Sequence, residues 1–192
     1  MTTQDSAAIH DLPTLLAAVR QGERFKYVFF WGHQPDKQGA ITKACFSQWW
    51  PATFVIDGVS YPTAEHYMMV EKARLFGDEE AAQKILAASH PRDAKNLGRT
   101  VANYDDARWE QHRFEIVIRG NLAKFGQNAP LRDFLLATAP RILVEASPLD
   151  KIWDIGLAET DERVYDPEQW NGLNLLGFAL MQVRTRLAHQ AE

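Results

Sequence analysis

The chain has 192 residues, of which 46% are hydrophobic and 24% are charged, and its formal net charge is -4 at pH 7. This length suits one domain with a sizeable core, and the composition excludes a chain that is disordered throughout. The negative charge argues against broad, phosphate-driven binding to nucleic acid but leaves room for a local basic pocket.

The cysteine count and the N-terminus point to a reducing, cytoplasmic setting. Cys45 is the single cysteine, so no intrachain disulfide can form. The apolar run at 15–19 is too short to span a membrane and has no basic segment before it, so neither a signal peptide nor a membrane segment is expected. The six histidines are scattered without the spacing of metal ligands. We therefore expect no metal and no cofactor.

The first third of the chain predicts one helix followed by strands. Residues 11–20 (DLPTLLAAVR) predict a short amphipathic helix. The aromatic and β-branched run at 26–32 (KYVFFWG) predicts a buried strand. Residues 44–61 alternate and contain Asp57-Gly58, so they predict strands that are joined by a hairpin at this turn.

The rest of the chain is mostly helical by pattern. A short strand is predicted over 142–147, between Pro140 and Pro148. Helices are predicted over 63–76, 78–88, 105–126, 131–137 and 174–189. The last of these has one apolar stripe, made of Leu173, Leu176, Leu180, Val183 and Leu187. Few strands and many helices, without regular βαβ alternation, predict one α+β domain in which helix predominates.

The predicted helix in YPTAEHYMMVEKARLF (61–76) carries two charges within an otherwise apolar face. Thr63 is a natural N-cap, which places Glu65 in the first turn. At about 100° per residue, Glu65 and Lys72 fall near the centre of the apolar arc, and Tyr67 falls on the opposite, polar side. Seven residues separate them by roughly 10 Å along the axis, which is too far for direct contact. Each charge therefore needs its own partner or a function.

Structural and functional interpretations of these two charges weigh about equally. Glu65 in a first turn also complements the helix dipole, which is a purely structural role. The same position lowers the pKa of its carboxyl group, so we expect Glu65 to be ionised near neutral pH. An ionised carboxylate is suited to act as a base, a nucleophile or a stabiliser of positive charge.

Two further segments carry polar and aromatic groups together. In SPLDKIWDIG (147–156), Ser147, Pro148 and Asp150 fit a capping box at the start of a helix, which favours a structural role for Asp150. Trp153 fits either the core or a platform for a flat ring. In FSQWWP (46–51), polar side chains alternate with rings, as in a pocket for a nucleobase, although core strands also contain tryptophan.

Two cations are candidates for holding a phosphate. Lys124, in GNLAKF, points into an apolar face, where lysine side chains commonly snorkel to the surface. Arg99 follows Gly98 in a predicted turn. Motifs for a dinucleotide fold, a P-loop or an α/β-hydrolase nucleophile are missing from the sequence.

Taken in order, these segments resemble the NADAR superfamily, which is also called YbiA-like. The resemblance rests on FSQWWP, DGVSYPTAEHYMMVEKA, LGR, Trp109, LAKF, LVEASPLDKIWDIGL and GLNLLGFALMQVR. It covers about residues 26–188, so we expect a helical extension over 1–25 and the NADAR-like domain over 26–192. It implies a compact, helix-predominant α+β fold with a small β-sheet, and hydrolysis of N-glycosidic bonds.

Within this family, the resemblance implies small-molecule ribosyl or ADP-ribosyl substrates. Some members cleave early intermediates of riboflavin biosynthesis, namely 5-amino-6-(5-phosphoribosylamino)uracil and its diamino-pyrimidinone precursor. Others remove ADP-ribose from guanine bases, including modified guanine in nucleic acid. A binder of ADP-ribose or a related nucleotide without catalytic activity is the alternative from another class.

The family's motif residues fall on defined positions of this chain. The motif glutamate falls on Glu65, the lysine of the same helix on Lys72, the aspartate of the later motif on Asp150 and the asparagine near the C-terminus on Asn174. By resemblance, we expect catalytic roles for Glu65, Asp150 and Lys72, and substrate binding by Asn174.

The expected substrate contacts also include Gln48, Trp50, Arg99 and Trp153. Two positions depart from the family pattern. Gln48 stands where the family usually has asparagine, which could alter the contacts to the base. Asp154 stands where a glycine usually follows the tryptophan, which adds a carboxylate beside the expected site.

The chemistry explains why such a site would need these groups. Cleavage of a ribosyl C–N bond builds positive charge on the sugar, in an oxocarbenium-like transition state. One well-placed carboxylate contributes on the order of 2–4 kcal/mol to its stabilisation. We expect Glu65 to act as the base or cation stabiliser, Asp150 as its partner, and Lys72 as an orienting or phosphate contact. The roles of Glu65 and Asp150 could be exchanged.

Overall fold

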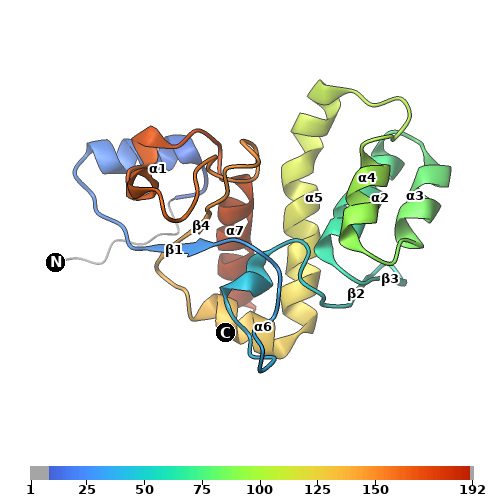
Figure 1. Cartoon of the computed structure of the whole chain (residues 1–192), viewed down its shortest axis with the longest axis horizontal. Helices are drawn as coiled ribbons and strands as arrows, with labels where there is room; N and C mark the ends of the chain where they lie inside the picture. Colours follow the sequence, from blue (N-terminus) through green and yellow to red (C-terminus); the bar gives the residue numbers. More distant parts are fainter. Residues whose placement is uncertain (1–8, 191–192) are drawn as a thin grey trace. The chain divides into compact units, whose positions relative to one another are not determined.

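Figure 1 shows the computed structural model, which describes residues 9–190. The fold is a helix-rich α+β fold, and the strands in the described residues form two small sheets of two strands each. The chain divides into two units. Residues 9–47 and 130–190 form one, here called the terminal unit, and residues 48–129 form the central unit.

The terminal unit is built on a parallel pair of buried strands. β1 pairs with β4 in register from Tyr27 opposite Ile142 to Phe30 opposite Glu145. The elements of this unit, with α6 beginning at the boundary, are α1 (Leu12–Arg20), β1 (Tyr27–Phe30), η2 (Lys43–Phe46), α6 (Ala129–Leu136), β4 (Ile142–Glu145), η3 (Glu162–Tyr165), η4 (Pro167–Gln169) and α7 (Leu175–His189). This arrangement confirms the strands predicted over 26–32 and 142–147.

Helix α7 packs on β4 at very close range. Its glycine, Gly177, faces the carbonyl oxygen of Leu143, and a Cβ atom at this position would overlap that oxygen. The apolar stripe that the sequence predicts is buried at Leu176, Leu180, Val183 and Leu187. Leu173, predicted as part of the stripe, precedes the helix and is exposed.

The central unit is a cluster of helices with one β-hairpin. Its elements are β2 (Phe54–Ile56), β3 (Val59–Tyr61), α2 (Ala64–Leu75), α3 (Glu79–Leu86), α4 (Pro91–Gly98) and α5 (Asp106–Gln127). The hairpin turns at Asp57 and Gly58, whose φ angles of 51° and 78° fit the left-handed turn that the sequence predicts. Helix α2 packs against α3, α4 and α5.

One predicted strand was wrong, and one helix was not predicted. The strand expected to begin at residue 44 is instead the 3-10 helix η2 followed by irregular chain, so only 54–56 and 59–61 of that prediction are strands. The alternation of aromatic and polar residues over 46–51 resembles the two-residue period of a strand, although the chain there does not form a strand. Helix α4 was not predicted because it is short and lacks a common N-cap residue. It begins at Pro91, and its N-cap is His90, whose Nδ1 accepts a hydrogen bond from Arg92 N at 3.1 Å.

Helix α2 is not amphipathic over its first two turns, contrary to the prediction. Residues 64–70 are all buried, so the first two turns of the helix have no solvent-facing side. Tyr67, expected on the polar side, is 1% exposed. Its ring lies edge-on to Phe54 and Tyr61, and it packs against Gly120 of α5. The helix is therefore held from several sides, which makes it a rigid platform for its side chains.

No helix within residues 9–190 is both long enough and apolar enough to cross a membrane.

We expect Gly177→Ala to destabilise the protein by about 1–3 kcal/mol, because the added methyl group overlaps a backbone oxygen that cannot move cheaply. This reverses the usual sign, since Gly→Ala inside a helix normally stabilises by up to about 1 kcal/mol. Urea unfolding followed by circular dichroism measures the difference. Gln182→Ala on the same helix is the control and should change stability by less than about 0.5 kcal/mol. Equal or higher stability of Gly177→Ala would refute the close packing.

Candidate functional site

The first turn of α2 holds Glu65 in a fixed, buried position. The hydroxyl of Thr63 accepts a hydrogen bond from His66 N, as the predicted N-cap. The backbone N–H of Glu65 donates to the carbonyl oxygen of Gln48 at 2.9 Å. Glu65 itself is 5% exposed. A carboxylate at this place receives the favourable field of the helix N-terminus.

His66 anchors the same turn to the link between α3 and α4. Its Nε2 lies 3.0 Å from the carbonyl oxygen of Ala88, and its Nδ1 lies 2.8 Å from the Thr63 hydroxyl. A carbonyl can only accept, so Nε2 carries the proton and Nδ1 accepts from Thr63. Burial lowers the pKa of His66, and the nearby His90 adds to this effect. The ring is therefore held in its neutral form.

Gln48 is tied to helix α5 through a buried amide pair. Its Oε1 accepts a hydrogen bond from Asn121 Nδ2 at 2.7 Å, and Asn121 also donates to Val117 O at 2.9 Å. Its Nε2 has, among residues 9–190, only the sulfur of Met68 as a weak partner, at 3.7 Å. The oxygen of Gln48 is thus occupied, and the N–H groups remain as its available donors.

Asn121 itself is fully buried, yet its Oδ1 has no hydrogen-bond partner among residues 9–190. An unpaired buried acceptor costs about 1–3 kcal/mol, so asparagine here is not the most stabilising choice. Its contact with Gln48 gives a reason for its presence. Sequence reasoning missed Asn121. The available signal was a polar residue within a run of buried helical positions.

Lys72 has structural partners in the central unit. Its Nζ donates to the carbonyl oxygen of Gly98 at 2.8 Å and lies 4.2 Å from the ring centroid of Tyr104 and 5.6 Å from that of Trp109. Burial lowers its pKa; Asp106 opposes this shift, and Arg99 adds to it. The question that the sequence raised about Lys72 is answered in part, because the charge has a carbonyl and two rings as partners.

Arg99 is the neighbouring cation. It is the C-cap of α4, and its side chain is exposed. Within the described part of the chain, its guanidinium makes no hydrogen bond or ion pair. Its charge is close enough to Lys72 to lower the pKa of that lysine. Two cations thus lie near each other in the central unit.

Lys124 differs from the expectation. Rather than snorkelling to the surface, its side chain is 0% exposed, and its Nζ lies 4.9 Å from the ring centroid of Phe125. A fully buried ammonium group is maintained only where partners compensate its desolvation. Lys124 and Asn121 are thus two polar residues of α5 whose complete burial the sequence did not predict.

In the terminal unit, Asp150 caps a turn and not a helix. Its Oδ1 accepts from Ile152 N at 2.6 Å and from Trp153 N at 3.0 Å, while Ser147 Oγ accepts from Leu149 N at 3.1 Å. No helix begins at Ser147, so the predicted capping box was wrong, and two successive side-chain-capped turns replace it. The Oδ2 atom of Asp150 makes no hydrogen bond to residues 9–190.

The segment after Asp150 is fixed on the N-terminus of α7. The N–H of Leu176 donates to the carbonyl oxygen of Trp153, and the N–H of Asn174 to that of Asp154. Asn174 has a positive φ of 54° and is fully buried. Its side chain accepts from Glu145 N at 3.0 Å and donates to Leu143 O at 2.9 Å. These bonds give Asn174 a clear role in joining α7 to β4.

The expected site residues thus fall into two groups. The central unit contains Gln48, Trp50, Glu65, Lys72 and Arg99, and the terminal unit contains Asp150, Trp153 and Asn174. Trp50 is 7% exposed and half-buried Trp153 is more accessible. No group of three or more metal-binding side chains that could hold an ion occurs in residues 9–190.

Comparison with known proteins gives consistent matches. Residues 29–188 match the NADAR domain. The chain is 45% identical over 168 residues to N-glycosidase R617 of Acanthamoeba polyphaga mimivirus, covering 84% of this chain and 96% of that protein. It is 35% identical over 139 residues to N-glycosidase YbiA of Escherichia coli K12, covering 72% and 77%. The NMR structure of E. coli YbiA matches with a TM-score of 0.70 at 30% identity, covering 88% and 89%.

The neutral state of His66 predicts a specific loss of stability in acid. Because its pKa is lowered in the folded protein, the unfolded chain binds the extra proton. The stabilisation is present above the ordinary value of 6.5 and decreases as the pH falls below it. Urea unfolding of wild type and His66→Gln between about pH 8 and pH 5 tests this. Wild type should lose more stability than the variant, whereas His112→Gln, at an exposed histidine, should follow wild type. Parallel curves for wild type and His66→Gln would contradict it.

Proposed function

This chain belongs to the NADAR family and is a hydrolase of N-glycosyl bonds, and we propose that it cleaves phosphoribosylamino-pyrimidine intermediates of riboflavin biosynthesis. The products would be ribose 5-phosphate and the free pyrimidine amine. The observation that carries the proposal is Glu65, a carboxylate buried in the first turn of a helix that is itself fixed on several sides.

The proposed role of Glu65 follows from the charge that develops in the reaction. The breaking C–N bond leaves positive charge on the sugar, so an adjacent carboxylate lowers the barrier or activates the attacking water. Such a group works best if it does not need to reorganise. The Thr63 cap and the bond from Glu65 N to Gln48 O supply this preorganisation.

Asp150 is proposed as the second carboxylate. One of its oxygens, Oδ1, is held by two backbone N–H groups, which fixes the side chain. The other oxygen is left for a water molecule or for the leaving group. Either carboxylate could take the role of base, with the other as its partner.

Lys72 and Arg99 are proposed to hold the phosphate of the substrate. An ammonium group has three donors, and Gly98 O takes only one of those of Lys72. Arg99 contributes a planar fork of donors that suits a phosphate. The lowered pKa of Lys72 beside Arg99 fits a site that an anion would stabilise.

Gln48, Trp50, Trp153 and Asn174 are proposed to bind the base. Since Asn121 occupies the oxygen of Gln48, Gln48 offers N–H groups, which suit the carbonyl oxygens of a pyrimidine. Trp153 offers a partly exposed ring as a stacking surface. For Asn174, whose amide already holds β4, the proposed contact would use its remaining acceptor capacity.

We expect Glu65→Gln to lose about 10²–10³-fold in kcat, the scale of one lost electrostatic contact to the transition state. The assay measures free ribose 5-phosphate or free ADP-ribose from a panel of phosphoribosylamino-pyrimidines and ADP-ribosylated guanine. Glu71→Gln is the matched control, because Glu71 lies on the same helix and pairs with Arg74 at 3.0 Å. It should retain activity.

The outcomes of this panel separate the alternatives. Release of ADP-ribose from modified guanine, but no turnover of the pyrimidines, would replace the proposed substrate within the same reaction class. Tight nucleotide binding without turnover of any N-riboside would indicate a binding protein. Full activity of Glu65→Gln would show that the assignment of Glu65 is wrong.

Asn121→Leu should raise KM for the pyrimidine substrate about 2–10-fold, the scale of one neutral hydrogen bond, with a smaller change in kcat. The reason is that Gln48 loses the donor that orients its amide. Combining Gln48→Asn with Asn121→Gln moves one methylene across the pair and should restore KM toward wild type. An unchanged KM in a folded Asn121→Leu variant would remove Asn121 as a positioning residue.

A further inference from the structure

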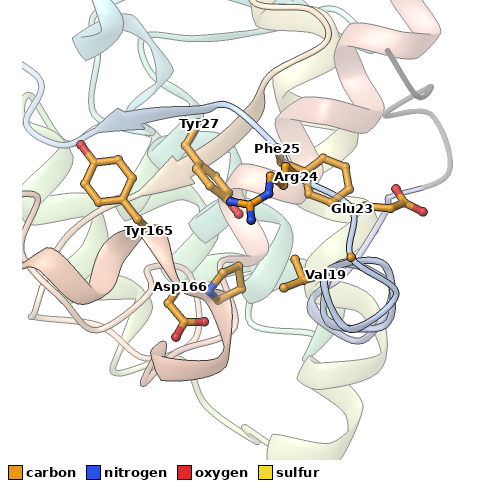
Figure 2. A pocket seen from close by; sticks show the side chains of 9 residues that line it. Val19, Glu23, Arg24, Phe25, Tyr27, Tyr165 and Asp166 are labelled. Atoms are coloured by element: carbon orange, nitrogen blue, oxygen red, sulfur yellow. The ribbon is translucent and has the colours of Figure 1, made fainter. Parts of the chain in front are cut away.

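A hollow of about 420 Å³ opens on the terminal unit, and its lining includes none of the residues proposed above for catalysis. It is lined by Val19, by residues 22–25, by Tyr27 and by residues 165–167, and Figure 2 shows it from close by. We call it the Arg24 hollow. Its volume is within the range of small-molecule sites.

Much of this lining lies outside the family match. Helix α1 and residues 22–28 precede the matched range of 29–188. They belong to the extension expected over 1–25 and to the chain just after it. Residues 1–8 of that extension lie outside the described residues. Most of the lining of the Arg24 hollow therefore comes from residues that precede the matched range, and residues 165–167 supply the rest.

The rings of Tyr27 and Tyr165 form the aromatic wall of the hollow, and packing holds both in place. The ring of Tyr27 stacks on Phe29 at 5.7 Å between centroids and meets Trp170 edge-on at 6.2 Å. The ring of Tyr165 meets Phe29 edge-on at 5.1 Å. Trp170 is itself fixed by its bond to Val164 O at 2.9 Å. The wall is thus preformed, and a ligand would not need to order it.

Arg24 supplies the positive charge of the hollow, whose lining also includes the acidic residues Glu23 and Asp166. In Figure 2 the guanidinium of Arg24 lies over the middle of the hollow, whereas the carboxylates of Glu23 and Asp166 point away from it. Asp166 is also engaged, since it accepts from Glu168 N at 3.1 Å and from Gln169 Nε2 at 2.7 Å. To the residues that the structure describes, the side chain of Arg24 makes no hydrogen bond or ion pair.

Tyr27 adds a second donor. Burial, with the nearby charge of Asp166, raises the pKa of its hydroxyl to about 12, so the group stays protonated at neutral pH. No hydrogen bond of this hydroxyl is found in residues 9–190. The Arg24 guanidinium offers donors only, the Tyr27 hydroxyl offers one further donor, and the rings of Tyr27 and Phe25 offer apolar surface beside them.

We propose that the Arg24 hollow binds a small molecule that carries a phosphate or carboxylate group on a flat aromatic body. The anionic group contacts the planar donor fork of Arg24 and the Tyr27 hydroxyl, and the flat body packs on the aromatic wall. This site is independent of the proposed N-glycosidase reaction.

The test titrates the full-length, isotope-labelled protein with phenyl phosphate, benzoate and inorganic phosphate and follows backbone amide shifts. We expect phenyl phosphate or benzoate to shift residues 19–27 and 165–167, and inorganic phosphate to bind more weakly. Arg24→Gln should weaken binding of the aromatic anion at least about tenfold, the scale of a charge-assisted hydrogen bond, and Tyr27→Phe by less.

Arg92→Gln is the control, because Arg92 is exposed on α4 in the central unit and should leave the affinity unchanged. Unchanged affinity in Arg24→Gln would overturn the proposal. So would shifts confined to residues near Lys72 and Arg99, or inorganic phosphate binding as tightly as phenyl phosphate. Since no arm of the experiment depends on turnover, its result is separate from that of the substrate panel.

Discussion

The central unit depends on how the first turn of α2 is fixed. Thr63 caps this turn with its hydroxyl, and the Gln48 carbonyl takes the N–H of Glu65 at 2.9 Å. His66 ties the turn to Ala88, and Tyr67 packs on α5. Because these contacts leave the turn little freedom, a buried carboxylate at residue 65 keeps one position. A charge that is both buried and preorganised is what cleavage of an N-glycosidic bond requires.

The other charges of this unit divide into satisfied and available ones. Lys72 has a carbonyl and two rings, which explains its place in a buried helix without any ligand. Arg99 is exposed and close enough to lower the pKa of Lys72. Structure and function are therefore not exclusive for Lys72. The same side chain is held by the protein and keeps donors for an anion.

Much of the fold could be predicted from the sequence because its signals are local. The Thr63 cap, the turn at Asp57-Gly58 and the apolar stripe of α7 each depend on a few neighbouring residues. The failures depend on tertiary contacts. Periodicity could not show that α2 is covered on several sides, that Lys124 is fully buried, or that Asn121 reaches Gln48 across 73 positions. The order of the motifs identified the family and the candidate residues. The same motifs could not show that Asp150 caps a turn rather than a helix.

The most direct measurement of the central claim is a crystal structure of Glu65→Gln with a phosphoribosylamino-pyrimidine bound. We predict intact substrate, with the anomeric carbon about 3–3.5 Å from the side chain of residue 65, the separation of reacting groups in a productive complex. The phosphate should contact Lys72 or Arg99. A sugar bound with its anomeric carbon far from residue 65, or a substrate already cleaved in the crystal, would contradict the account.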